Sequence, residues 1–321
     1  MKRALKRLRR HGFSGVLGIL LVQGVVWAAE PVAVLTEFRA GKGEVRVKRA
    51  NETDWTAPQP LLALRPGDQI RVTADGRAVL AFTGGGAETV SAANSPFTVQ
   101  APRGESGSER VRGLLAGVTQ FLLGQQKEPT YQSLSVRSLA AEPPRILSPR
   151  ETRLLPGPVT FEWAGHRSLR YRVRVSGPQG VEWEQGDLPR QPVEYPASAP
   201  PLRPGTRYAW DVDTPGQPVQ RAQFEILSTA EAARIQAALA DLRPATLAAY
   251  PPNTVVLMRA GLLFQEGLYA DARRELQAGI AADPDEPALR LLLGYVYDRV
   301  GLAELAASEF DEAQYLSTRK P

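Results

Sequence analysis

The chain of 321 residues contains no cysteine and only two histidines. The absence of cysteine excludes disulfide bonds, a lipid-modified cysteine, thiol nucleophiles and cysteine-based zinc sites. His11 lies in a basic N-terminal stretch, and His166 lies in an Ala-Gly-His-Arg stretch that we interpret as an exposed turn. The sequence also lacks a G-x-S-x-G motif. We therefore predict that the protein is not an enzyme and has no catalytic, cofactor-binding or metal site.

Outside the first ten residues, the chain has no net positive charge. The formal net charge of the whole chain is +5, from 39 basic and 34 acidic residues. Six of the basic residues precede the first acid, so the remainder has 33 basic residues against 34 acidic ones. No basic footprint is left for a nucleic acid to bind, and we predict no nucleic-acid partner.

Residues 1–28 have the pattern of a secretory signal peptide. A basic start is followed by an apolar run from Val16 to Trp27 and by Ala28. We place the cleavage after Ala28 and predict a periplasmic protein. The alternative is an uncleaved N-terminal anchor, which would be the protein's one contact with a membrane; the run is short for a bilayer span.

Residues 29–142 are predicted to form a β-rich domain. Val45 and Val47 alternate with charged residues, as in a half-buried strand. Asp75-Gly76 predicts a hairpin turn within residues 72–82, and the glycines at 84–86 predict a loop. A helical period predicts an amphipathic helix near 109–125. This helix could dock on the β domain, touch a membrane surface or receive a partner; docking is favoured because interfacial helices usually carry a basic face. Residues 131–139 are predicted to add a strand.

Several stretches of this first domain match one family of bacterial envelope modules. The matching stretches are Gly43-Glu44-Val45-Arg46-Val47, Trp55, Leu64, Gly67-Asp68-Gln69-Ile70 and Ala78-Val79-Leu80-Ala81-Phe82. On these residues the domain resembles the FecR domain, which implies a β-rich fold. In the best-known members the module lies in the periplasm and controls a sigma factor through a membrane helix and a cytoplasmic region. We interpret Asp68 as a carboxylate that caps a turn.

Residues 144–227 are predicted to form a second, antiparallel β domain. Phe161 and Trp163 alternate with polar residues, and short strands of this kind recur with turn residues between them. The stretch 202–208, ending in Tyr208, resembles the turn into strand F of fibronectin type III domains. The resemblance implies a β-sandwich in which this tyrosine bonds back to the backbone. Arginines at 170, 172 and 174 could bind an anionic glycan or a partner, or form a solvated sheet face, which we favour.

Residues 228–321 are predicted to be helical and to contain an internal repeat. Ser228 and Glu231 form a capping box at the start of the first helix. Gly267 and Gly301 are 34 residues apart, and four further pairs of small or apolar residues share this period. The pattern resembles two tetratricopeptide repeats, at 253–286 and 287–320. The resemblance implies a module that binds other polypeptides.

The same resemblance assigns a protein-binding groove to the first helix of each repeat. The implied residues are Leu257, Gly261, Phe264, Leu291, Tyr295 and Asp298. Large apolar and aromatic side chains suit an anchor for a helix or an extended peptide. The rival explanation is that the helix at 228–242, or the second β domain, fills this groove and makes the same residues part of the core.

The sequence thus predicts a multidomain fold class: an all-β FecR-like domain, a fibronectin type III-like β-sandwich and a C-terminal α-solenoid of tetratricopeptide repeats. The predicted function is a non-enzymatic scaffold or adaptor of the cell envelope that binds another envelope protein or peptide. Alternatives are a FecR-type envelope sensor that feeds a signalling partner, and a module that binds peptidoglycan or another cell-wall glycan.

Overall fold

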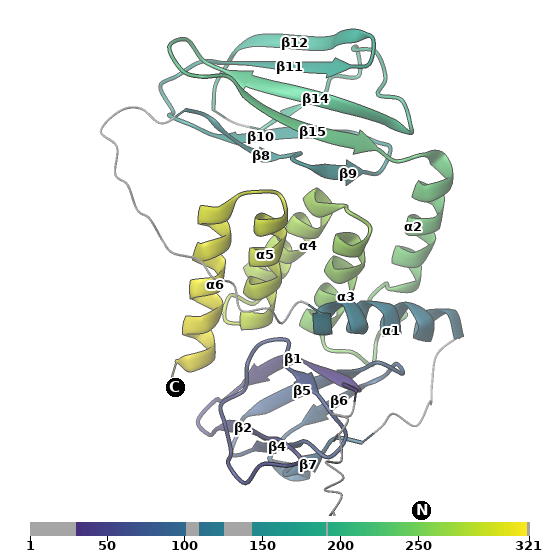
Figure 1. Cartoon of the computed structure of the whole chain (residues 1–321), viewed down its shortest axis with the longest axis vertical. Helices are drawn as coiled ribbons and strands as arrows, with labels where there is room; N and C mark the ends of the chain where they lie inside the picture. Colours follow the sequence, from purple (N-terminus) through teal and green to yellow (C-terminus); the bar gives the residue numbers. More distant parts are fainter. Residues whose placement is uncertain (1–29, 101–108, 125–142, 191, 320–321) are drawn as a thin grey trace, which may run out of the picture.

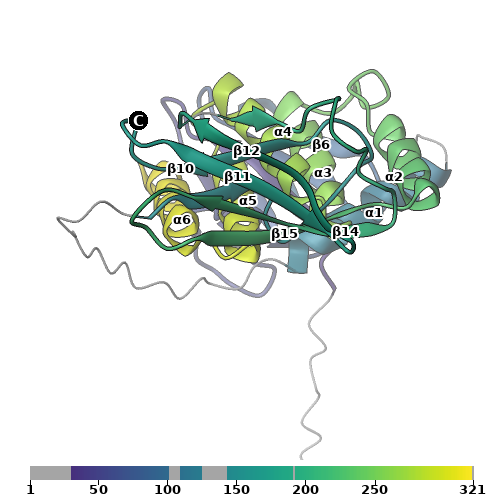
Figure 2. The same cartoon turned by 90° about the horizontal axis from the view of Figure 1, so that it is seen from above.

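The computed structural model describes residues 30–100, 109–124, 143–190 and 192–319. Figure 1 shows a helical layer that lies between two β parts. We call residues 30–100 the N-terminal β part, residues 143–227 the central β part, and the six α-helices the helical layer. Seen from above, the sheets of the central β part cover the helices (Figure 2).

The N-terminal β part contains two antiparallel sheets. The first has the order β3-β1-β5-β6 and the second the order β2-β4-β7. Asp68 lies in the turn before β4, and its carboxylate accepts hydrogen bonds from the backbone amides of Ala50 and Arg65 at 3.0 Å each, so the predicted turn cap is confirmed. The strands are β1 (Ala33–Arg39), β2 (Val45–Lys48), β3 (Ala63–Leu64), β4 (Gln69–Val72), β5 (Arg77–Phe82), β6 (Ala87–Val90) and β7 (Phe97–Thr98).

The hairpin predicted within residues 72–82 is wrong. The turn at Asp75-Gly76 joins β4 to β5, but β4 pairs with β2 and β7 whereas β5 pairs with β1 and β6. A two-residue type I′ hairpin needs positive φ at both central residues. Here the positive φ falls on Ala74 (52°), so the chain crosses from one sheet to the other.

The central β part consists of a three-stranded sheet, β13-β10-β8, and a five-stranded sheet, β12-β11-β14-β15-β9. Fully buried aromatic side chains between them include Phe161 and Trp210. Tyr208 accepts a hydrogen bond at its hydroxyl from the backbone amide of Arg203 at 2.8 Å, which confirms the predicted tyrosine bond. The strands are β8 (Arg145–Ser148), β9 (Thr152–Leu154), β10 (Thr160–Ala164), β11 (Tyr171–Gly177), β12 (Gly180–Leu188), β13 (Val193–Glu194), β14 (Thr206–Asp213) and β15 (Gln220–Ile226).

The helical layer ends in two helix pairs with equivalent turns. Gly267 and Gly301 both adopt positive φ, at 76° and 75°. The next amides, of Leu268 and Leu302, each donate to a carbonyl five residues earlier at 2.8 Å. The predicted capping box of Ser228 is present at the start of α2. The helices are α1 (Glu109–Gly124), α2 (Thr229–Asp241), α3 (Pro252–Gln265), α4 (Tyr269–Ala282), α5 (Pro287–Arg299) and α6 (Ala303–Thr318).

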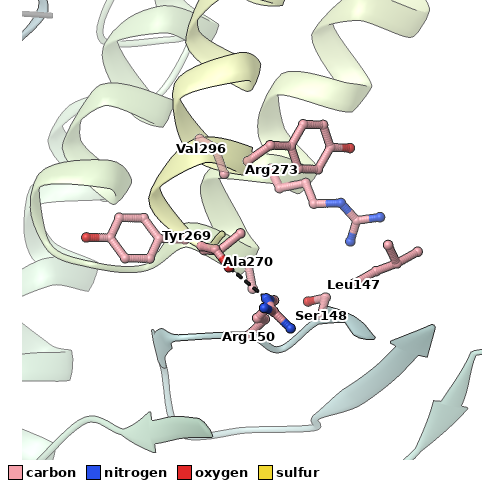
Figure 3. A pocket seen from close by; sticks show the side chains of 9 residues that line it. Leu147, Ser148, Arg150, Tyr269, Ala270, Arg273 and Val296 are labelled. Carbon is pink, nitrogen blue, oxygen red and sulfur yellow. Dashed lines mark hydrogen bonds between the residues drawn. The ribbon is translucent and has the colours of Figure 1, made fainter. Parts of the chain in front are cut away.

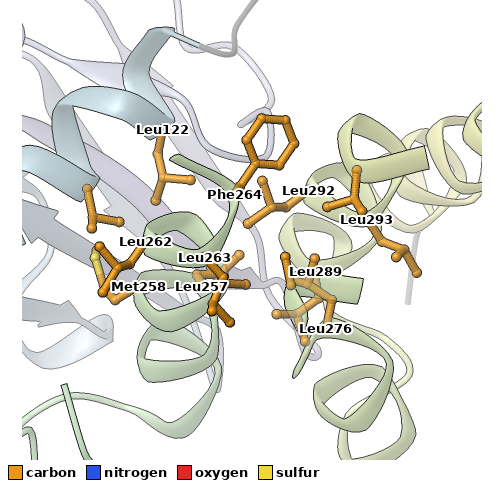
Figure 4. Close-up of a cluster of buried hydrophobic side chains, with 14 of the residues drawn as sticks. Leu122, Leu257, Met258, Leu262, Leu263, Phe264, Leu276, Leu289, Leu292 and Leu293 are labelled. Carbon is orange, nitrogen blue, oxygen red and sulfur yellow. The ribbon is translucent and has the colours of Figure 1, made fainter. Parts of the chain in front are cut away.

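Helix α3 is the centre of the largest apolar core. It packs against α1, α4, α5 and β1, so its apolar side chains point in every direction. A helix that is apolar all round is normally enclosed by other elements. Figure 4 shows Leu122 of α1 facing the leucines and Met258 of α3, with α5 on the far side. Helix α1 is therefore a wall of the helical layer. It also packs on β1 and β5, so the favoured prediction that it docks on the N-terminal β domain is confirmed.

The central β part joins the helical layer through polar contacts (Figure 3). Arg150 donates from Nε to the carbonyl of Val300 at 2.7 Å, and the amide of Arg153 donates to the carbonyl of Gly267 at 2.8 Å. Arg273 of α4 pairs with Glu162 of β10 at 2.8 Å. The first two bonds hold the turns after α5 and α3 against the chain at β9, and the third holds α4 against β10.

The N-terminal β part joins the helical layer through buried carboxylates. Glu37 is 1% exposed and accepts hydrogen bonds from the amide and hydroxyl of Thr254 at 2.8 and 2.7 Å. Arg77 pairs with its other oxygen at 2.9 Å. Glu286, also 1% exposed, caps α5 through the amide of Ala288. Burial, together with the charge of Glu37, raises the pKa of Glu286 well above its usual value.

These contacts overturn the predicted fold class of an all-β domain, a β-sandwich and an α-solenoid as successive units. The described residues form six α-helices and four β-sheets; the first region contributes α1 to the helical layer, and the C-terminal helices show no clear solenoid pattern. The 34-residue period shows which residues recur along the chain. It does not show which other elements of the fold cover the faces of a helix, so the fold class could not be predicted from it.

Residues 1–28, predicted as a signal peptide, and residues 131–139, predicted as a strand, lie outside the described residues. Within the described part, no helix has both the length and the apolar character needed to span a membrane.

Candidate protein-binding groove

A groove opens on the helical layer where α1, α3 and α5 meet the turn between α3 and α4. Its volume is about 440 Å³, and four of its side chains are aromatic. We call it the aromatic groove. Its lining residues are Phe121, Phe264, Gln265, Tyr269, Tyr295, Asp298 and Arg299.

Three aromatic side chains of this groove pack on one another, and the fourth packs on an aromatic residue of α6. The ring centroids of Phe121 and Phe264 are 5.1 Å apart, and those of Phe264 and Tyr269 are 5.2 Å apart. Tyr295 packs edge-on against Phe310, with centroids 5.2 Å apart. Phe264 is nearly buried, while Phe121, Tyr269 and Tyr295 are half-buried. Tilted and edge-to-face contacts of this kind are favourable, so the groove has a preformed apolar surface.

Arg299 stands at the end of this aromatic row. Its Nε donates to the hydroxyl of Tyr269 at 2.9 Å, and its guanidinium lies 5.9 Å from the centroid of that ring. The hydrogen bond raises the pKa of Arg299. Burial, together with the charge of Asp298, raises the pKa of Tyr295 to about 12. At neutral pH the groove therefore presents a neutral tyrosine beside a guanidinium cation.

A second groove adjoins the first along the edge of the central β part. Its volume is about 420 Å³, and it shares Tyr269 and Arg299 with the aromatic groove. We call it the edge groove, because strand β9 is the last strand of its sheet. Its lining residues are Glu151, Thr152, Arg153, Arg207, Gln223, Phe224, Glu225, Gly267, Tyr269 and Arg299.

The structure places three of the six predicted groove residues in the aromatic groove: Phe264, Tyr295 and Asp298. Leu291 is half-buried and packs on the core outside this groove. A role of these four residues in binding a partner remains a prediction.

The other two predicted groove residues are buried. Leu257 is 0% exposed, so it has no surface on which a partner could bind. Gly261 faces α1: a Cβ atom added there would lie 2.7 Å from Val118 Cγ1 and 3.6 Å from Leu122 Cδ2. At Gly261 the covering element is α1, not the helix at 228–242 or the central β part that the rival explanation named.

Sequence reasoning missed four residues of the aromatic groove and the whole edge groove; the four are Phe121, Gln265, Tyr269 and Arg299. Phe121 adjoins the buried pair Leu122-Leu123 on α1, and a large aromatic residue on the flank of an apolar helix face is a usable signal. Nothing in the sequence marks Arg299, because its neighbours in space come from other helices and from the central β part.

Other candidates from the sequence have structural roles. The hydroxyl of Ser168 lies 2.7 Å from His166 Nδ1 within the predicted turn. Arg170, which precedes β11, and Arg172 and Arg174 of β11 each face an acid on a neighbouring strand, as expected of a solvated sheet face. The pairs are Arg170–Asp187 at 3.8 Å, Arg172–Asp213 at 2.8 Å and Arg174–Glu184 at 2.6 Å.

Among the residues that the structure describes, no group of three or more histidine, aspartate or glutamate side chains is placed to hold a metal ion. No family model matches this sequence, and a search of curated proteins finds no match either. A function must therefore be inferred from the two grooves and from the resemblances in the sequence.

Proposed function

We propose that this protein is a non-enzymatic adaptor of the cell envelope that binds an extended segment of another protein in the aromatic groove. The observation that carries the proposal is the row of fixed aromatic side chains that ends in Arg299. Aromatic and arginine side chains supply most of the binding energy in typical protein interfaces.

The dimensions of the groove suit a peptide. A volume of about 440 Å³ falls within the range of ligand pockets, and the edge groove extends the same surface beyond Arg299. A preformed surface also lowers the entropy that binding costs, since Phe264 and Tyr269 already hold their rings in place.

The resemblances in the sequence support this proposal. Residues 253–320 resemble tetratricopeptide repeats, which bind polypeptides, and they supply six of the seven side chains that line the aromatic groove. The signal-like N-terminus and the FecR-like stretches favour the periplasm as the place of action. The β parts would then set the distance of the groove from the cell wall or contact the wall directly.

A library of random peptides displayed on phage tests the proposal with the purified protein as bait. Selected peptides should bind the protein and should lose binding to Gln265→Trp, since Gln265 is exposed and a tryptophan there would fill the groove without disturbing the core. Tyr295→Ala should also weaken binding. Tyr315→Ala is the matched control, because Tyr315 is 56% exposed on α6 and does not line the groove.

Thermal unfolding of each variant separates loss of binding from loss of folding. Peptides that bind the wild-type protein and Gln265→Trp equally would show that binding occurs elsewhere. Failure to enrich any peptide sequence would contradict the proposed function.

A further inference from the structure

Within the described part of the chain, Arg299 differs from the other two arginines that line the grooves in that it has no acidic partner. Arg153 pairs with Glu231, and Arg207 lies 3.4 Å from Glu225. Among the described residues, no carboxylate oxygen lies within 4.0 Å of the guanidinium of Arg299. This cation is exposed at the junction of the aromatic and edge grooves.

The guanidinium of Arg299 is also oriented in advance. The hydrogen bond from Nε to Tyr269 and the ring beneath it hold the planar group while its two terminal nitrogens stay outside this bond. A guanidinium presents parallel N–H donors that match a carboxylate in two-point geometry. Orientation before binding reduces the side-chain entropy lost when such a pair forms.

The position of Arg299 decides which kind of carboxylate fits. Arg299 and Tyr269 line both grooves, so a bound chain that reaches Arg299 from the aromatic groove can continue into the edge groove. A chain that continues past this point offers a side-chain carboxylate there, whereas a C-terminal carboxylate would leave the second groove empty.

We propose, on the basis of the proposed function, that the partner segment carries an internal aspartate or glutamate that pairs with Arg299. A large apolar residue next to this acid packs between Phe264 and Tyr295. The remainder of the segment then runs along the edge groove.

Neighbouring charges determine where along the two grooves this acid is placed. Asp298 lines the aromatic groove and repels a carboxylate placed on that side of Arg299. On the opposite side, Arg207 is exposed and attracts it, although Glu225 partly neutralises this arginine. The most favourable place for the acid is therefore between Arg299 and Arg207.

The test uses random 12-residue peptides fused through their C-termini to a phage coat protein, so that no peptide has a free C-terminal carboxylate. The selected peptides should share an aspartate or glutamate beside a large apolar residue. In fluorescence titrations, Arg299→Ala should weaken their binding about 10- to 100-fold, the range for loss of a hydrogen bond to a charged group. A peptide with asparagine or glutamine in place of the acid should bind the wild-type protein more weakly by a similar factor. Arg299→Ala should not weaken the binding of this peptide any further.

Arg167→Ala is the control, because Arg167 is an exposed arginine in a turn of the central β part that lines neither groove. Arg299→Lys keeps the charge but not the fork geometry, and should bind with intermediate affinity. Selected peptides without an acid, or acidic peptides that bind Arg299→Ala normally, would overturn this inference and leave the proposed function intact. Selection only in a second library with free C-termini would also overturn it. If neither library enriches a sequence, the proposed function itself fails.

Discussion

The close crossing of α1 and α3 predicts an unusual effect of adding one methyl group. Alanine is favoured over glycine by about 1 kcal/mol inside a helix, so Gly→Ala at an open helix position should stabilise the protein. At Gly261 the new Cβ would lie 2.7 Å from Val118 Cγ1, and a β-branched side chain on a helix has little freedom to move. Overpacking of this kind costs about 1–3 kcal/mol, so Gly261→Ala should leave stability unchanged or lower it by up to about 2 kcal/mol.

Gly117→Ala is the matched control, since Gly117 is exposed on α1 with no atom within 4 Å of the added Cβ. It should raise the free energy of unfolding by about 1 kcal/mol. In a Val118→Ala background the clash disappears, and Gly261→Ala should then be stabilising as well. Urea unfolding followed by circular dichroism at 222 nm measures all four variants. If Gly261→Ala stabilises the wild-type protein as much as Gly117→Ala does, α1 does not pack on α3. Helix α1 would then not form a wall of the aromatic groove.

Three further changes test other parts of the structure. Glu286→Gln should stabilise the protein at pH 8, because burial and Glu37 raise the folded-state pKa of Glu286 above its unfolded value, so the ionised side chain costs stability as the pH rises. Urea titrations at pH 8 and pH 4.5 measure the gain in the free energy of unfolding, which should be smaller at pH 4.5. A gain that does not depend on pH would contradict this reasoning. Tyr208→Phe removes the acceptor of the Arg203 amide and should lower the free energy of unfolding by about 0.5–1.5 kcal/mol, whereas no change in thermal unfolding would show that water replaces the bond. Leu257→Ala should cost about 2–5 kcal/mol in the same measurement, and a surface-like cost below about 0.5 kcal/mol would place Leu257 in a groove after all.

Much of the local structure could be predicted from the sequence. Phe161 and Trp163 alternate with polar residues and are buried on one face of β10, as period two requires. The capping box at Ser228 and the hydroxyl bond of Tyr208 are also present. In each case the residues that form the feature lie within a few positions of one another in the sequence. A short stretch of sequence is therefore enough to predict it.

The arrangement of these elements could not be predicted in the same way. The 34-residue period located the turns at Gly267 and Gly301, but it gave no sign that α1 covers Gly261. Three of the seven residues that line the aromatic groove were predicted because they occupy groove positions of the repeat. Gln265, Tyr269 and Arg299 belong to the repeat but lie outside those positions, and Phe121 and the edge of the central β part reach the site only through tertiary packing.

The joint between β1 and α3 has a consequence for the order of folding. Thr36 and Thr254 share a hydrogen bond although they are 218 positions apart in the chain. At synthesis rates of roughly 5–20 residues per second, about 10–45 s separate the appearance of the two residues at the ribosome. During that interval the apolar side chains of β1 and α1 have no α3 to pack against. The core that α3 completes between the N-terminal β part and the helical layer therefore cannot form until the last quarter of the chain is made.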